Sequence, residues 1–131
     1  CRALLADNVS RCSAPLPREG SICCVAHNDA YSVSYLKYKS VSKEANDLRK
    51  HVQLRRGEVS GLALEQVLER ISGIHAYLDT TTEELALRRE HDRRFIGTPD
   101  SGHQFRLEKL EQQQRSARDL LRMLETRTRV L

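Results

Sequence analysis

The stretch CRALLADNVSRCSAPLPREGSICCVAH, residues 1–27, contains all 4 cysteines of the 131-residue chain. Cys1, Cys12, Cys24 and His27 follow the spacing C-x10-C-x11-C-x2-H. Three thiolates and one imidazole complete the tetrahedral coordination of a structural Zn²⁺ and leave no open position for chemistry. The spacing therefore predicts a structural zinc site with these four ligands. Cys23 is the alternative to Cys24, because a Cys-x3-His pair also fits on a helix.

The residues between the predicted ligands favour turns. Pro15 and Pro17 exclude a long helix, and Gly20 allows a positive φ angle. Such a loop would take much of its folding free energy from the metal. Four cysteines could instead form two disulfides in a secreted helical factor. We favour zinc because disulfides would leave the long helical part unstapled and the spacing of His27 unexplained.

Three runs in this stretch resemble the short zinc domains of nuclear proteins that use three cysteines and one histidine. They are Cys1-Arg2-Ala3, the run from Arg11 through Cys12 to Pro15, and the run from Gly20 to His27. Domains of this kind include the WRC domain of plant growth-regulating factors and similar fingers in subunits of chromatin-modifying complexes. The resemblance covers about a fifth of the chain. It implies metal ligation by the same four residues and a nuclear, DNA- or chromatin-associated setting.

The composition is that of long helices around a thin core. Hydrophobic residues make up 39% of the chain and charged residues 31%, and there is no Trp. The formal net charge of +4 is uneven, since residues 31–56 hold 7 basic and 2 acidic side chains. No apolar run reaches the roughly twenty residues of a membrane span. A chain that begins on Cys1 is expected to be an excerpt or a processed product.

Helical spacing of apolar residues predicts helices over about residues 30–56, 61–96 and 103–130. Asn28 or Asp29 is the expected cap of the first helix and Ser60 of the second. Gly57 and Gly61 predict a turn or kink between the two, and residues 97–102 predict a loop. The stripe of the first helix consists of Tyr31, Tyr35, Tyr38, Val41, Ala45, Leu48 and Val52.

The second and third predicted helices carry a heptad seam. The seam favours an antiparallel hairpin within the chain, and pairing with a second chain, including another copy of this one, is the alternative. The polar residue Gln114 is expected to set the register. The predicted coiled-coil interface consists of Leu64, Val67, Ile71, Ile74, Leu78, Leu85, Leu107, Leu110, Ala117, Leu121 and Leu124.

The basic part of the first helix allows two interpretations. We favour a solvated face, with Tyr35 and Tyr38 packed against a neighbouring element. The alternative is a nucleic-acid surface on which the two tyrosines stack on bases. Its contacts would be Lys37, Lys39, Lys43, Arg49, Lys50, Arg55 and Arg56.

No residue pattern predicts an active site. Glu83 and Glu84 are neighbours that point apart on a helix, and we expect both to be solvated. The run Glu90-His91-Asp92 is expected to be an exposed charged turn of helix. The histidines lie at no recognisable nucleophile motif, and no glycine-rich phosphate loop is present. We therefore predict that the chain is not an enzyme.

Together these patterns predict a mainly α protein. A zinc knuckle over residues 1–30 would be followed by a two- or three-helix antiparallel coiled-coil region over residues 31–131. The expected function is protein–protein interaction in a larger nuclear or chromatin-associated assembly, in a reducing compartment and without a membrane. The alternatives are a nucleic-acid-binding module that uses the finger with residues 31–56, and the secreted disulfide-stapled factor.

Overall fold

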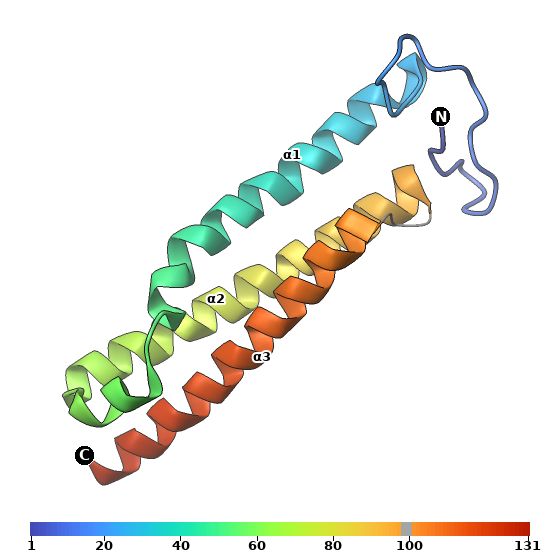
Figure 1. Cartoon of the computed structure of the whole chain (residues 1–131). Helices are drawn as coiled ribbons and strands as arrows, with labels where there is room; N and C mark the ends of the chain where they lie inside the picture. Colours follow the sequence, from blue (N-terminus) through green and yellow to red (C-terminus); the bar gives the residue numbers. More distant parts are fainter. Residues whose placement is uncertain (98–100) are drawn as a thin grey trace.

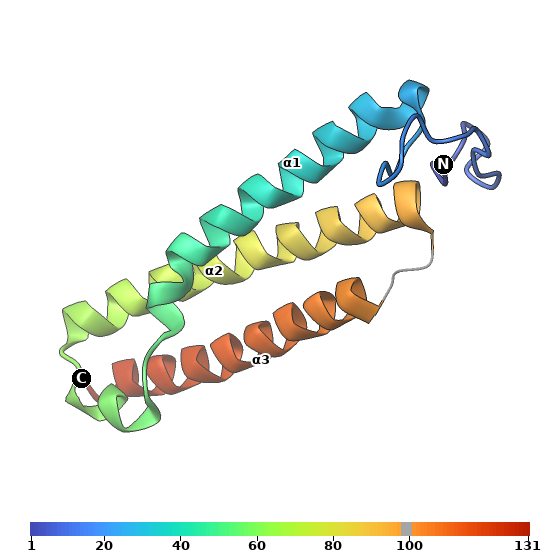
Figure 2. The same cartoon turned by 45° about the horizontal axis from the view of Figure 1, so that its top comes forward.

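The computed structural model describes residues 1–97 and 101–131. Three long helices, α1 (Val25–Leu48), α2 (Leu64–His91) and α3 (Ser101–Val130), follow an N-terminal segment. Neighbouring helices run antiparallel, and α2 lies between α1 and α3 (Figures 1 and 2). The prediction of a mainly α chain with a small N-terminal unit and an antiparallel helical region is therefore confirmed. Of the predicted loop over 97–102, residues 98–100 lie outside the described residues.

The ends of the helices differ from the expected ones. The helix α1 starts after Cys24, so Asn28 and Asp29 lie inside it, and it ends at Leu48. Two short 3₁₀ helices, η1 (Arg49–Val52) and η2 (Arg56–Gly61), then carry the chain to α2. The chain leaves the axis of α1 here because Val52, Leu54 and Val59 pack against the core instead of extending the helix.

The start and the end of α2 also have local causes. Ser60 does not cap this helix, since its hydroxyl donates to the carbonyl of Gly57. The N-cap is Ala63, whose N–H donates to the side-chain oxygen of Gln66 at 3.0 Å. At the other end, α2 continues into a single π-helical turn, η3 (Asp92–Ile96), which Gly97 terminates with a φ angle of 89°.

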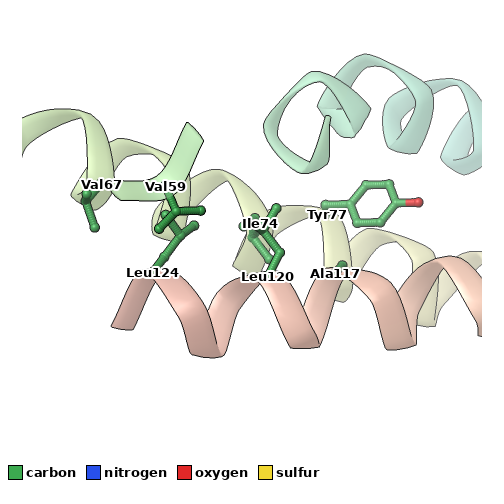
Figure 3. Packing of buried hydrophobic residues seen from close by; sticks show 7 residues of the cluster. All are labelled: Val59, Val67, Ile74, Tyr77, Ala117, Leu120 and Leu124. Atoms are coloured by element: carbon green, nitrogen blue, oxygen red, sulfur yellow. The ribbon is translucent and has the colours of Figure 1, made fainter. Parts of the chain in front are cut away.

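The main core lies between α2, α3 and the η1–η2 connection. Buried side chains from α2 and α3 alternate along the interface, and Val59 of η2 covers their end (Figure 3). Each fully buried side chain of this size stabilises the fold by roughly 1.5–3 kcal/mol. The cluster consists of Val59, Val67, Ile74, Tyr77, Ala117, Leu120 and Leu124.

A polar layer interrupts the seam between α2 and α3. Gln114 is 5% exposed, and its amide nitrogen lies 2.9 Å from the hydroxyl oxygens of both Thr81 and Thr82. The hydroxyl of Thr81 also donates to the carbonyl of Tyr77 at 2.8 Å. A slip of one helix along the other would leave these buried groups without partners, so the layer favours a single register.

An aromatic cluster joins α1 to the carboxyl-terminal part of α2. The ring of His91 packs between Tyr31 and Tyr38, with ring centroids 4.8 and 5.1 Å away, and Phe95 closes the cluster. Tyr38 is buried and lies under the guanidinium of Arg88. The tyrosines of α1 thus pack against a neighbouring helix.

Two expectations about charged residues are wrong. Glu84 is fully buried, whereas its neighbour Glu83 is exposed. His91 and Asp92 are also buried, although the run was expected to be exposed. The cause is that α2 packs on two sides. His91 lies against α1, with its Nδ1 2.8 Å from the hydroxyl of Ser34, while Glu84 pairs with Arg88 on its own helix and with Arg106 of α3.

Gly73 allows the close approach of η1 to α2. A methyl group at this position would overlap the ring of His51. We expect Gly73→Ala to lower the free energy of unfolding by about 1–3 kcal/mol, because the clash outweighs the roughly 1 kcal/mol that alanine gains in helix propensity. In a His51→Ala background the same change should become stabilising, and urea unfolding of the four proteins measures both effects. If Gly73→Ala lowers the free energy of unfolding equally in both backgrounds, the clash with His51 is contradicted.

Burial of His91 makes stability depend on pH. Burial lowers the pKa of its imidazole to about 4, assisted by the charges of His103, Arg88 and Arg94. The unfolded chain, with an ordinary pKa near 6.5, therefore binds the proton first as the pH falls. Between pH 6.5 and 4, the free energy of unfolding of the wild-type chain should fall by about 3 kcal/mol more than that of His91→Phe. Both proteins keep all the other titrating groups, so the difference between their plots of unfolding free energy against pH isolates His91. Parallel plots would contradict the lowered pKa of His91.

Within the described residues, no helix is both long enough and apolar enough to cross a bilayer.

Candidate metal centre

The N-terminal segment and the start of α1 bring four metal-binding groups together. The Sγ atoms of Cys1, Cys12 and Cys24 and the Nδ1 atom of His27 all lie within 4.8 Å of one another. Nδ1 of His27 is 3.2 Å from the sulfur of Cys24 and 3.6 Å from that of Cys1. The sulfurs of Cys12 and Cys24 are 3.9 Å apart, so they are not disulfide-bonded. The four groups are close enough to bind one metal ion.

A tight turn brings the first two ligands together. Asp7 accepts hydrogen bonds from the N–H groups of Val9 and Ser10 at 2.9 and 2.8 Å, and Asn8 adopts a left-handed φ of 59°. The chain then returns beside itself, with the N–H of Cys12 donating to the carbonyl of Ala3 at 2.8 Å. Cys1 and Cys12 therefore reach the site from adjacent extended segments.

The other two ligands lie on the first turn of α1. Cys24 is the N-cap of this helix, and His27 follows three residues later on the same face. Burial opposes ionisation of the Cys24 thiol, but the backbone N–H groups of His27 and Ala26 and the side chain of Cys12 lower its pKa overall. A thiolate at a helix N-terminus is favoured by the same groups. Cys24 is thus prepared to bind a metal as the thiolate.

Cys23 has a different role from Cys24. Its side chain is 1% exposed and packs against Ala3 and Phe95, outside the group of four ligands. Burial raises the pKa of the Cys23 thiol, with a further contribution from Cys24. The arrangement therefore favours Cys24 as the ligand and gives Cys23 a place in the packing.

The ligand-bearing segment is attached to the far end of α2. The N–H of Leu4 donates to the carbonyl of Arg94 at 2.6 Å. Ala3 and Cys23 form a small buried cluster with Phe95 of η3, and Tyr31 of α1 packs against it. Figure 1 shows the segment beside the amino end of α1 and the carboxyl end of α2. A metal held here would fasten the N-terminal segment to the start of α1, while the contacts with Arg94 and Phe95 hold it to the end of α2.

The residues predicted for the coiled-coil interface and for nucleic-acid contact differ in their burial. Most of the coiled-coil set is buried between α2 and α3, whereas Leu64 is exposed and Ile71, Leu78 and Leu121 are half-buried. All seven candidate nucleic-acid contacts are exposed, and in the described parts of the chain none forms a salt bridge. They are Lys37, Lys39, Lys43, Arg49, Lys50, Arg55 and Arg56.

The sequence patterns missed the residues that support the metal ligands. Ala3 and Phe95 are nearly fully buried beside the site, yet they lie about ninety positions apart in the chain. The one available signal was the resemblance of the run Cys1-Arg2-Ala3 to a finger, which gives no partner for Ala3.

Comparison with protein families, with curated proteins and with solved structures finds no match to this chain.

Proposed function

We propose that Cys1, Cys12, Cys24 and His27 hold one structural Zn²⁺. Three thiolates and an imidazole are a donor set that zinc prefers. A zinc ion with Zn–S bonds of about 2.3 Å in a tetrahedron separates its sulfurs by about 3.8 Å, and the sulfurs of Cys12 and Cys24 are 3.9 Å apart. Four protein ligands would leave the ion without a position for a substrate, so its role would be structural.

We further propose that the zinc-stabilised helices serve as a protein–protein interaction module. The observation that carries this proposal is a pair of apolar side chains on α1, since Val33 and Leu36 are 68% and 64% exposed. Because most of the heptad seam is buried within the chain, a partner would contact this face. The nuclear and chromatin-associated setting rests on the resemblance of the ligand-bearing stretch alone and stays a prediction.

Elemental analysis of protein purified without chelator tests the zinc proposal. One zinc per chain is expected, with most thiols becoming reactive only after a chelator is added. Another metal at full occupancy would contradict zinc. The absence of both metal and reactive thiols would favour the disulfide alternative. It would also contradict the expected reducing compartment.

Affinity capture from a native extract tests the interaction. The wild-type chain should retain a partner protein that Val33→Glu combined with Leu36→Glu loses, while the matched exposed change Lys43→Glu keeps it. Apolar contacts make the retention insensitive to added salt. The same proteins bound by all three chains would contradict a role for this face.

Nucleic-acid binding is the second candidate, because the seven exposed cations between Lys37 and Arg56 form no salt bridge in the described part of the chain. Binding through phosphates weakens steeply with salt. Affinity for duplex DNA, measured from low salt upward, therefore separates the two candidates. No binding at low salt would exclude this one.

A further inference from the structure

A pocket with two cations lies where η1 passes over α3. Its volume is about 320 Å³, and the residues around it come from η1 and its flanks, from α2 and from α3. The cations Arg49 and Lys109 belong to the lining, and none of the described residues that line the pocket is an aspartate or glutamate. The lining is completed by Val52, Gln53, Tyr77, Gln112, Gln113, Ser116 and Ala117.

In the described residues, no salt bridge neutralises the charges of the two cations. Neither Arg49 nor Lys109 forms a salt bridge in the described residues, although α3 carries acidic groups nearby. Those groups are used elsewhere, since Glu111 pairs with Arg89 and Glu108 accepts a hydrogen bond from Gln104. The pocket therefore has two positive charges that an anionic ligand could meet.

The carboxyl end of α1 opposes this attraction only partly. Arg49 is the C-cap of α1, so the partial negative charge of the helix end, about half a charge, lies close to the pocket. Two full cations outweigh it.

The buried side of the pocket offers donors and an apolar wall. Tyr77 is 3% exposed, and its hydroxyl lies 3.5 Å from Oε1 of Gln113, a long contact for a hydrogen bond. Figure 3 shows this hydroxyl pointing away from the rest of the apolar cluster. Burial raises the pKa of Tyr77 while the charge of Arg49 opposes the rise, so this cation acts on the hydroxyl. Ala117 and Val52 supply apolar contact beside the ring.

From this arrangement we infer that the pocket binds a small organic phosphate. The two cations and the side-chain amides suit a dianionic phosphoryl group, because charge-assisted hydrogen bonds are the strong ones. The ring of Tyr77 and the aliphatic wall suit an aryl or alkyl group attached to it. The volume lies at the lower end of the range of small-molecule sites. This inference does not rest on the proposed zinc site, since Arg49 lies at the opposite end of α1 from Cys24.

Calorimetric titration of the metal-loaded chain with phenyl phosphate tests the inference at constant ionic strength. A saturable one-to-one isotherm is expected, with inorganic phosphate weaker and phenol not binding. Arg49→Gln and Lys109→Gln should each weaken binding about tenfold, the loss of one charge-assisted hydrogen bond. Lys43→Gln removes an equally exposed cation of α1 outside the pocket lining and should leave the affinity unchanged.

Amide shifts in the NMR spectrum locate the ligand. Changes should concentrate at residues 49–53 and 109–117. The inference is overturned if no saturable binding occurs, if Lys43→Gln weakens binding as much as Arg49→Gln does, or if the shifts cluster elsewhere. If inorganic phosphate binds as tightly as phenyl phosphate, the inference that the ligand carries an organic group is overturned. Displacement of phenyl phosphate by duplex DNA, together with a loss of affinity in Lys43→Gln as large as in Arg49→Gln, would identify a nucleic-acid surface instead.

Discussion

Replacing Cys24 by serine is expected to abolish metal binding and to release residues 1–23 from the helices. The site loses a ligand whose thiolate is favoured by the first turn of α1. Serine is a good N-cap, so α1 itself should still start at the same place. Structural zinc contributes about 10–16 kcal/mol of binding free energy in small finger peptides, which is the folding free energy of the loop. The segment should therefore become disordered while the rest of the chain stays folded.

Hydrogen exchange separates these two parts of the molecule. The amide of Leu4 donates to Arg94 and that of Cys12 to Ala3, so both should be protected in the wild-type chain and exchange freely in Cys24→Ser. Amides of α3 around Leu120, inside the main core, should keep their protection. Loss of protection throughout the chain would contradict a local role for the metal.

Cys23→Ala is the matched control for this experiment. It removes the neighbouring sulfur, which packs against Ala3 and Phe95 outside the group of four ligands. One metal ion per chain should remain, with a destabilisation of about 1 kcal/mol from the lost packing. Metal retained by Cys24→Ser and lost by Cys23→Ala would assign the ligand to Cys23 instead.

Short-range patterns in the sequence predicted the features that depend on residues close together in the chain. Val67 and Ile74 on α2, and Leu110 and Leu124 on α3, repeat at heptad spacing within their own helices, and all four are buried. The set of four metal ligands could be proposed for a similar reason, because spacing and residue chemistry are both visible in a short stretch.

The burial of Glu84 and His91 could not be predicted in this way. The two residues are seven positions apart on α2, but both are polar. A search for apolar periodicity assigns such residues to solvent. Only their partners explain the burial: Ser34 of α1 for His91, and Arg88 with Arg106 of α3 for Glu84. The pocket between η1 and α3 was equally hidden, since it joins segments sixty residues apart.

Neutralising Glu84 is expected to lower the free energy of unfolding by about 3–5 kcal/mol. Its carboxylate is fully buried, 2.7 Å from Nε of Arg88 and 3.6 Å from the guanidinium of Arg106. Glu84→Gln keeps the volume but leaves Arg88, whose side chain is 11% exposed, without its counter-charge.

Two further variants make this prediction specific, with urea unfolding of the metal-loaded chain as the measurement. Glu83→Gln is the matched control one residue away, and because Glu83 is exposed it should change stability by less than about 0.5 kcal/mol. Glu84→Leu combined with Arg88→Met removes both charges and should recover most of the loss, since apolar side chains of similar volume can replace a buried ion pair. Arg106 is half-exposed and can turn towards water. Equal effects of the two single Gln variants would mean that Glu84 is solvated in the folded protein, and would contradict its burial beside Arg88 and Arg106.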